Sequence, residues 1–227
     1  MSVICIIPAR GGSKGIPRKN LQEVGGIPLI DRAIQTVSSS AVADHIIVST
    51  EDAEIANHAT QLGATHVQRP IELATDEATS ESVLLHALQA LGVTAGDLLF
   101  VQTTTPLLYS SDLQDLVKNY AGYDSSLTVT ESHGFLWRPT TDGSLTGVNH
   151  DPQKRLRRQD IDGAEYLENG AAYLMRIEGF IAAQHRFFGR IGCSIMPRSR
   201  SVEVDNMDDL LLVRLIDKAL AERQQNN

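Results

Sequence analysis

The sequence has little of what marks secreted, membrane-spanning or disordered chains. Its 227 residues include two cysteines, one tryptophan and only 5% aromatic residues. No run of about 18 apolar residues occurs, so we expect no helix that crosses a membrane. No basic stretch precedes the apolar run 3–7, so we expect no secretory signal. Cys5 and Cys193 both lie in apolar runs, which favours buried free thiols in the cytoplasm over a disulfide.

Acidic residues are absent from the first 22 positions, although the net charge of the chain is −8. Four cations fall in that same stretch: Arg10, Lys14, Arg18 and Lys19. The overall charge argues against a nonspecific nucleic-acid binder, which would carry a basic face. The local excess of cations in an acidic protein instead predicts a site for a small anion.

Apolar runs typical of strands alternate with helical patterns along the chain, which predicts a single α/β domain over residues 1–227. The predicted strands are 2–7, 45–50, 65–68, 97–102, 126–130, 171–175 and 191–196. The predicted helices are 28–37, 55–62, 82–91, 113–120 and 210–220, with Ser111 and Gln114 as a capping box ahead of the fourth. The expected fold is a mostly parallel sheet with helices on both faces.

Residues 131–168 interrupt this alternation with glycines, prolines and basic residues. Asp142-Gly143 is typical of a hairpin turn. A long loop without structure is uncommon inside a compact domain, so we expect a β-arm or dimer element that leaves the sheet.

The loop from Pro8 to Asn20 follows the first strand and combines three glycines with the four cations. Ligands of open α/β sheets bind beyond the carboxyl ends of the strands. Glycines let backbone N–H groups face an anion, and cations such as Arg10, Lys14 and Lys19 neutralise a triphosphate. The spacing fits neither the P-loop nor the dinucleotide motif. The alternative is a mobile surface loop kept soluble by its charges.

This loop, Pro8-Ala9-Arg10-Gly11-Gly12-Ser13-Lys14-Gly15-Ile16-Pro17-Arg18-Lys19-Asn20, resembles the signature of the N-acylneuraminate cytidylyltransferases. The resemblance continues in order along nearly the whole chain. Its further segments are Val48-Ser49-Thr50-Glu51-Asp52, Arg69-Pro70 through Asp76 with Ser80, Phe100 through Leu107, Arg158-Gln159, Asn169-Gly170-Ala171 with Tyr173, and Phe187-Phe188.

The resemblance implies a Rossmann-like fold, a homodimer and a Mg²⁺-dependent reaction. CTP and a nine-carbon 2-keto sugar acid would give a CMP-sugar and pyrophosphate, mainly through positioning and charge neutralisation. It implies Arg10 and Lys19 as catalytic residues. The implied nucleotide contacts are Arg10, Ser13, Lys14, Asn20, Arg69 and Ser80. The implied sugar contacts are Lys19, Gln102, Arg158, Gln159, Asn169, Tyr173, Phe187 and Phe188, and one of the two adjacent phenylalanine rings is expected to enter the partner subunit.

Glu203 and Asp205 alternate with apolar residues, so on a strand they would project from one face. Two carboxylates on one face suit a hard cation that also binds phosphate oxygens. The family usually has Asp-x-Asp at this place, so the resemblance makes Asp205 the main Mg²⁺ ligand and Glu203 a direct or water-mediated one. The alternative is an edge strand with solvated acids.

Other readings of the chain stay open at this stage. The same chemistry on legionaminic, pseudaminic or deoxyoctulosonic acid is the nearest alternative. A sugar-1-phosphate nucleotidyltransferase is more distant, because its usual Gly-x-Gly-x-Arg opening is missing. A noncatalytic CTP-binding regulator would keep the loop without turnover. The seven histidines are scattered and show no metal-binding spacing.

Overall fold

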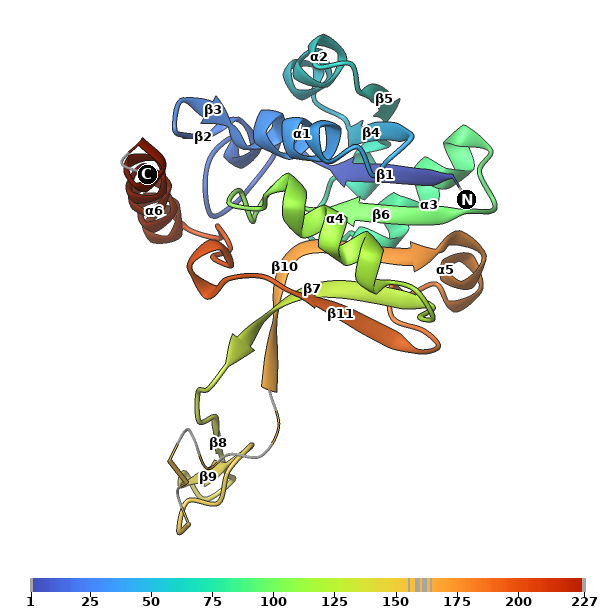
Figure 1. Cartoon of the computed structure of the whole chain (residues 1–227). Helices are drawn as coiled ribbons and strands as arrows, with labels where there is room; N and C mark the ends of the chain where they lie inside the picture. Colours follow the sequence, from blue (N-terminus) through green and yellow to red (C-terminus); the bar gives the residue numbers. More distant parts are fainter. Residues whose placement is uncertain (1, 155, 158–159, 161–162, 164, 226–227) are drawn as a thin grey trace.

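The computed structural model describes residues 2–154, 156–157, 160, 163 and 165–225. A seven-stranded sheet with the order β11-β7-β10-β6-β1-β4-β5 forms its centre (Figure 1). These strands are β1 (Val3–Pro8), β4 (His45–Thr50), β5 (Thr65–Gln68), β6 (Asp97–Val101), β7 (Ser125–Ser132), β10 (Glu165–Arg176) and β11 (Ile191–Ile195). β10 runs antiparallel to both of its neighbours, whereas the other neighbouring strands of this sheet are parallel. The predicted mostly parallel sheet is therefore confirmed.

Helices cover both faces of this sheet because its strands are apolar on both sides. On β1, Cys5 and Ile7 face one core cluster, while Ile4 and Ile6 face the other. α1 (Leu29–Ser40), α2 (Ala53–Gln61) and α4 (Ser110–Asn119) contribute to the first cluster. α3 (Ser80–Leu91) and α5 (Ile177–Ala183) contribute to the second.

A third, smaller apolar cluster fastens the C-terminal helix to the loop after β1. α6 (Met207–Gln225) contributes Leu210 and Val213, and the loop contributes Ile16. A short hairpin of β2 (Glu23–Val24) and β3 (Ile27–Pro28) completes the cluster with Val24. The sequence patterns did not predict this hairpin or α5. The third cluster also contains Val204, so it brings the chain ahead of α6 beside the loop after β1.

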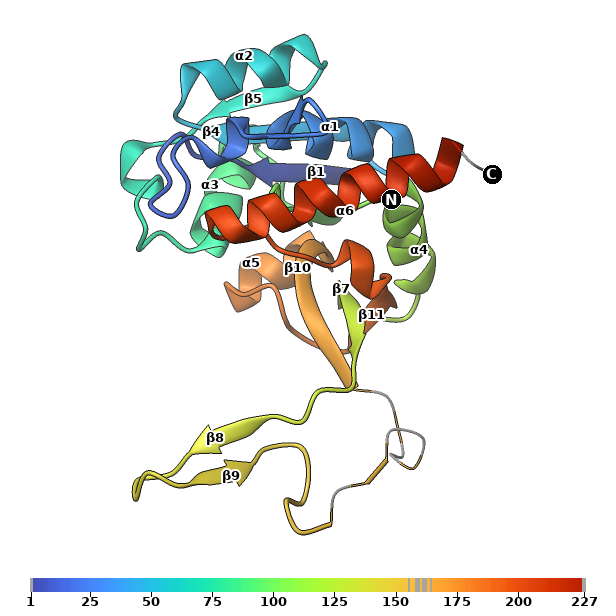
Figure 2. The ribbon, with the colours of Figure 1, turned by 90° about the vertical axis from the view of Figure 1, so that its left-hand side faces the viewer.

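The segment between β7 and β10, residues 133–164, extends away from the sheet and is called the arm below (Figures 1 and 2). β8 (Trp137–Pro139) and β9 (Leu145–Gly147) pair there as the predicted hairpin, and Gly143 in its turn has a φ of 85°. β7 and β10 pair with each other as far as Ser132 and Glu165. The arm therefore begins and ends inside the predicted range 131–168.

Three local predictions differ from the structure. α4 begins at Ser110, and its first turn is closed by the Asp112 carboxylate, which accepts a hydrogen bond from the Tyr109 N–H (2.8 Å), so Ser111 and Gln114 form no capping box. Residues 201–204 form no strand. Cys5 is a buried free thiol, whereas Cys193 is a free thiol that is only half-buried, because β11 is the edge strand.

No helix in the described part of the chain is long and apolar enough to cross a membrane.

Candidate functional site

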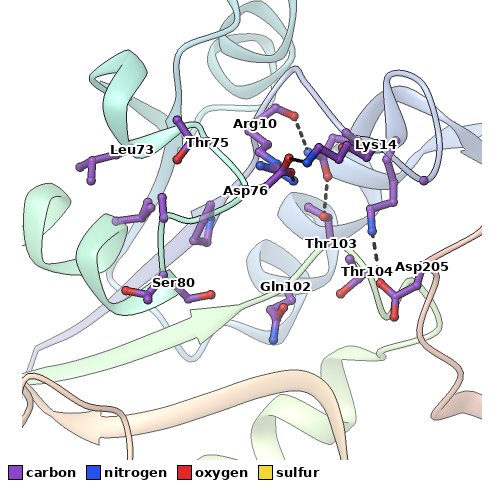
Figure 3. A pocket seen from close by; sticks show the side chains of 18 of the residues that line it. Arg10, Lys14, Leu73, Thr75, Asp76, Ser80, Gln102, Thr103, Thr104 and Asp205 are labelled. Carbon is purple, nitrogen blue, oxygen red and sulfur yellow. Dashed lines mark hydrogen bonds and ion pairs between the residues drawn. The ribbon is translucent and has the colours of Figure 1, made fainter.

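A pocket of about 380 Å³ opens at the carboxyl ends of β1 and β6. Its walls are the loop after β1, the connection from β5 to α3, the turn after β6 and the chain ahead of α6 (Figure 3). The predicted site residues that line it are Arg10, Ser13, Lys14, Lys19, Asn20, Arg69, Ser80, Gln102, Glu203 and Asp205. The topology thus brings together segments that lie up to 195 positions apart in the sequence, between Arg10 and Asp205.

Two of the pocket's cations share one carboxylate. Arg10 Nη2 and Lys14 Nζ each lie 2.6 Å from an oxygen of Asp76, from the connection between β5 and α3 (Figure 3). The hydrogen bonds from Lys14 and from Arg10 lower the pKa of Asp76. The sequence analysis quoted Asp76 within a motif without giving it a role. Its carboxylate holds the two cations on one side of the pocket, where phosphate oxygens would compete with it.

Lys19 reaches the opposite wall of the pocket. Its Nζ donates to the Val204 carbonyl (2.9 Å) and lies 3.4 Å from Asp205 Oδ1. The Lys19 side chain is 17% exposed, against 81% for Lys14. A cation that is largely withdrawn from water interacts more strongly with a charge in the pocket than an exposed one does. Lys19 is therefore the better placed of the two to stabilise charge that develops during a reaction.

Asn20 is buried beneath the pocket floor, and both ends of its amide are already used. Its Nδ2 donates to the Arg10 carbonyl (2.8 Å), and its Oδ1 accepts from the Thr103 hydroxyl (2.6 Å). The amide thereby ties the two ends of the loop together and joins them to the turn after β6. Asn20 lines the pocket as predicted, but its contacts are those of a residue that shapes the loop.

Arg69 is the most buried of the pocket's cations, with 4% of its surface exposed. Its guanidinium donates to the hydroxyl (3.3 Å) and the carbonyl of Ser49 at the end of β4. Burial lowers the pKa of Arg69 to about 10, against the opposing charge of Glu51. The group still carries its charge at neutral pH and offers a fixed planar donor at the rear of the pocket.

The two candidate metal ligands, Glu203 and Asp205, lie on the segment that directly precedes α6. Glu203 accepts a hydrogen bond from the Thr104 hydroxyl (3.2 Å), and burial together with the neighbouring charge of Asp205 raises its pKa. Gly170 has a φ of 65°, and a Cβ there would come within 2.9 Å of the Glu203 carboxylate. The positive φ calls for a glycine at position 170, whereas the Glu203 carboxylate, as the end of a flexible side chain, could move away from a Cβ. The sequence analysis quoted this glycine without seeing that reason.

These two carboxylates suit a hard cation, because they line the same pocket as the cations Arg10, Lys14 and Lys19. Asp209 Oδ2 accepts from the N–H groups of Asp205 and Asn206 (both 3.0 Å), which holds the Asp205 backbone in place. A Cβ on Gly15 would collide with the Asp205 carbonyl, so the loop and this segment pack closely. Among the described residues, no three His, Cys, Asp or Glu side chains form a metal cluster. Any ion here would therefore need phosphate oxygens and water to complete its shell.

Two of the predicted sugar contacts, Asn169 and Tyr173, are buried in the subunit, and their contact with a sugar stays a prediction. The Asn169 amide is buried and bonds to the hydroxyls of Thr128 (2.7 Å) and Ser201 (3.0 Å). Tyr173 is 2% exposed, stacks on Phe100 at 5.2 Å and donates its hydroxyl hydrogen to Glu168. Neither side chain lines the pocket. Both lie on β10.

The paired phenylalanines also differ from expectation. Phe187 and Phe188 are both half-buried against the same core cluster of their own subunit, rather than one ring turning inward and one outward. They achieve this because they lie in a loop after α5, where Phe187 meets Tyr173 edge-on and Phe188 packs over Gly179. Arg158 and Gln159 lie outside the described residues.

Comparison with known proteins gives the chain its family. A family model described as cytidylyltransferase matches residues 4–179. The chain belongs to the cytidylyltransferase family. The family predicted from the loop after the first strand is confirmed, and the matched range contains the phosphate-facing walls of the pocket but not Glu203 and Asp205.

Curated relatives are 30–35% identical to the chain over the aligned residues. An N-acylneuraminate cytidylyltransferase of Streptococcus agalactiae is 30% identical over 233 residues, covering 99% of this chain and 56% of the relative. One of Escherichia coli is 31% identical over 222 residues, covering 95% and 52%. N-acylneuraminate cytidylyltransferase A of Danio rerio is 35% identical over 182 residues, covering 78% and 42%. The chain thus spans about half the length of these relatives.

Solved structures share the fold. A CMP:2-keto-3-deoxy-manno-octonic acid synthetase complexed with CTP has a TM-score of 0.68 at 15% identity, covering 99% of this chain and 100% of the other. A 4-diphosphocytidyl-2C-methyl-D-erythritol synthase from Anaerococcus prevotii has a TM-score of 0.70 at 13% identity, covering 94% and 97%. At such identities these likenesses speak for the α/β architecture alone.

Proposed function

We propose that the chain transfers CMP from CTP to a nine-carbon 2-keto sugar acid of the sialic acid type and releases pyrophosphate. The observation that carries this proposal is the convergence of Arg10, Lys14 and Lys19 with Glu203 and Asp205 on one pocket. A site with cations for a triphosphate and carboxylates for a metal fits nucleotidyl transfer. The curated relatives named N-acylneuraminate cytidylyltransferase favour the sialic type of acceptor.

The reaction needs little covalent help from the protein. The anomeric hydroxyl of the sugar attacks the α-phosphorus in line while pyrophosphate leaves, so positioning and charge neutralisation carry the catalysis. Arg10 and Lys14 hold the β- and γ-phosphates after these displace the Asp76 carboxylate. Lys19 lies where the α-phosphate meets the sugar carboxylate. Ser13, Arg69 and Ser80 complete the nucleotide contacts, and Gln102 faces the sugar.

A Mg²⁺ ion is part of the proposal, with Asp205 and Glu203 as its protein ligands. Such an ion would neutralise phosphate charge and draw electron density from the leaving pyrophosphate. The donor set supports it, since two carboxylates beside phosphate-binding cations are the partners that Mg²⁺ takes in nucleotide sites. Lys19, 3.4 Å from Asp205, then keeps the carboxylate oriented toward the pocket.

A homodimer is also part of the proposal. The arm exposes Leu136 (57%), Trp137 (48%) and Leu145 (59%) in the single subunit, and Leu167 on the adjoining part of β10 is 60% exposed. An apolar surface on an extended hairpin that has no core of its own is typical of an element that packs on another molecule. A partner would also supply groups to the sugar side of the pocket. The free thiols Cys5 and Cys193 favour the cytoplasm as its location.

A substrate panel tests the function. Several nucleoside triphosphates are crossed with N-acetylneuraminic, legionaminic, pseudaminic and deoxyoctulosonic acids, and pyrophosphate release is measured with Mg²⁺ present. We expect release only with CTP, and fastest with N-acetylneuraminic acid. Faster release with one of the other keto acids would reassign the acceptor. Binding of CTP without release under any combination would favour a noncatalytic regulator.

A further inference from the structure

The segment Glu51-Asp52-Ala53-Glu54, which joins β4 to α2, has no role in the reaction proposed above. It lies behind the loop that follows β1 and touches that loop at both ends. We propose that this segment is a clamp that fixes the phosphate-binding loop, and that it holds Arg18 in a left-handed conformation which aims Lys19 into the pocket. Arg18, Glu51 and Asp52 are then positioning residues.

At the start of the loop, Glu51 fixes the backbone. Its Oε1 accepts the Gly11 N–H at 2.7 Å. A Cβ on Gly11 would collide with the Asp52 carboxylate, so the loop can approach this segment only with glycine there. The charge of Glu51 also acts on Arg69 at the rear of the pocket. The Glu51 carboxylate therefore interacts both with the loop after β1 and with Arg69, which follows β5.

At the end of the loop, Arg18 adopts a backbone conformation that a residue with a side chain rarely takes. Its φ is 53° and its ψ is 40°. Ala41 and Gln184 also have positive φ, but each directly follows the last residue of a helix, where this conformation is the usual helix ending. Arg18 instead precedes the turn Lys19–Leu21. A rare conformation outside such an ending persists only where its surroundings enforce it.

The enforcing contacts come from the clamp. Arg18 Nη1 lies 2.6 Å from Asp52 Oδ2, and Arg18 Nη2 lies 2.5 Å from Glu54 Oε2. Asp52 is itself fixed, because its Oδ1 accepts from the N–H groups of Glu54 (3.0 Å) and Ile55 (3.1 Å) at the start of α2. Burial opposes the ionisation of Asp52, but the Ile55 and Arg18 hydrogen bonds outweigh it and lower its pKa.

The geometry of Arg18 sets the direction of Lys19. The Leu21 N–H donates to the Arg18 carbonyl (2.9 Å), which closes the turn that carries Lys19. Lys19 then points across the pocket to the Val204 carbonyl. A shift of about 1 Å in a catalytic group can cost roughly 10²-fold in rate. A change at position 18 should therefore act on Lys19 without touching a substrate.

Steady-state kinetics of Arg18→Ala and Arg18→Gly test this step, with CTP and N-acetylneuraminic acid as probes. We expect Arg18→Ala to lower kcat by roughly tenfold, with the KM for CTP nearly unchanged, because Lys19 is misplaced. Arg18→Gly removes the ion pairs but takes positive φ freely, so its kcat should lie between that of Arg18→Ala and the wild type. A wild-type kcat in Arg18→Ala, or no recovery in Arg18→Gly, would overturn the proposal.

Two matched variants control for general effects. Gln184→Ala replaces another side chain at a positive φ, remote from the pocket, and should leave kcat unchanged. Asp52→Asn keeps a good helix-capping side chain but loses the charge that holds Arg18. Asp31→Asn removes a carboxylate from the first turn of α1, where it pairs with His58. Asp52→Asn should lower kcat, and Asp31→Asn should not. Equal losses in Asp52→Asn and Asp31→Asn would overturn the clamp.

Hydrogen exchange supplies a readout that does not depend on the proposed reaction. In Asp52→Asn and Arg18→Ala, amide exchange of residues 10–21 should be faster than in the wild type, while α3 and α4 stay unchanged. Unchanged exchange in the loop would overturn the clamp. If the wild-type chain releases no pyrophosphate from any pair of substrates, the proposed function is wrong, but the clamp is not thereby excluded. The hydrogen-exchange result still decides whether the clamp exists.

Discussion

The pocket and the arm are built in opposite ways. The phosphate-facing walls of the pocket rest on buried strands, and their charged groups are held by partners within one subunit, such as Asp76 for Arg10 and Lys14. The arm has a short hairpin, exposed leucines and no core beneath it. Under the proposed function, the cations and carboxylates of the pocket form the nucleotide half of the site, and one chain supplies them all. The sugar half is proposed to need groups from a second subunit.

The largest effect should come from the nucleotide half. Lys19→Ala removes a largely buried cation that stabilises charge in the transition state, so turnover should fall by roughly 10²-fold or more. Pyrophosphate release at saturating CTP measures it. Lys118→Ala, in the last turn of α4, is the matched control and should keep wild-type turnover. Near-normal turnover of Lys19→Ala would show that Lys19 does not stabilise the transition state.

The carboxylates ahead of α6 should give the next largest effect. Asp205→Asn replaces a charged ligand by a weaker neutral one, so the Mg²⁺ concentration for half-maximal activity should rise by at least roughly tenfold, the cost of losing even an outer partner of a metal. Glu203→Gln should be milder. Titration of activity with Mg²⁺ compares the two. A normal requirement in Asp205→Asn would place the metal elsewhere.

Changes in the arm should leave the nucleotide half intact. The double change Leu136→Ser and Leu145→Ser removes two exposed apolar side chains, so it should weaken the dimer. The same double change should raise the apparent KM for the sugar acid, with little change for CTP, because the proposed partner acts on the sugar side of the pocket, remote from the phosphates. Light scattering after size-exclusion chromatography reports the oligomer. A fully active monomer would show that no second subunit completes the site.

The smallest effect on activity should come from Asn169. Asn169→Ala leaves the hydroxyls of Thr128 and Ser201 without their amide partner in the interior, so unfolding free energy should fall by about 1–3 kcal/mol. Thermal unfolding measures this loss. The KM for the sugar acid, measured at a temperature where the variant is folded, should stay unchanged. A raised KM with unchanged stability would show that Asn169 contacts the sugar acid, as the sequence predicts.

Sequence reasoning succeeded where function is local in the chain. The loop from Arg10 to Asn20 concentrates glycines and cations after a buried strand, and this pattern alone indicates an anion site. Burial, by contrast, could not be derived from the sequence. Asn169 and Tyr173 match a family motif and were predicted as sugar contacts, and the structure shows that both are buried on β10.

Long-range partners were equally hidden from the sequence. Asp76 pairs with Arg10 across 66 positions, and the Glu203 carboxylate lies close to Gly170, which is 33 positions earlier. The capping box at Ser111 shows the limit at short range. The motif is present in the sequence, but the helix begins at Ser110, two residues before the start that a cap at Ser111 would give, and the Asp112 carboxylate closes its first turn.

The strand order of the sheet has a consequence for how the protein is made. β7 ends at Ser132, yet both of its neighbours, β10 and β11, are encoded later, from Glu165 and Ile191. Translation proceeds at about 5–20 residues per second, so the 33 positions from Ser132 to Glu165 take roughly 2–7 s to synthesise.

During that interval β7 has no strand to pair with, while β1, β4, β5 and β6 can already assemble. The nascent chain therefore holds a finished parallel half beside an unpaired strand whose free N–H and C=O groups invite pairing with other chains. The arm lies between β7 and β10. The pairing of β10 with β7 therefore completes this part of the sheet and fixes both ends of the arm at the same time.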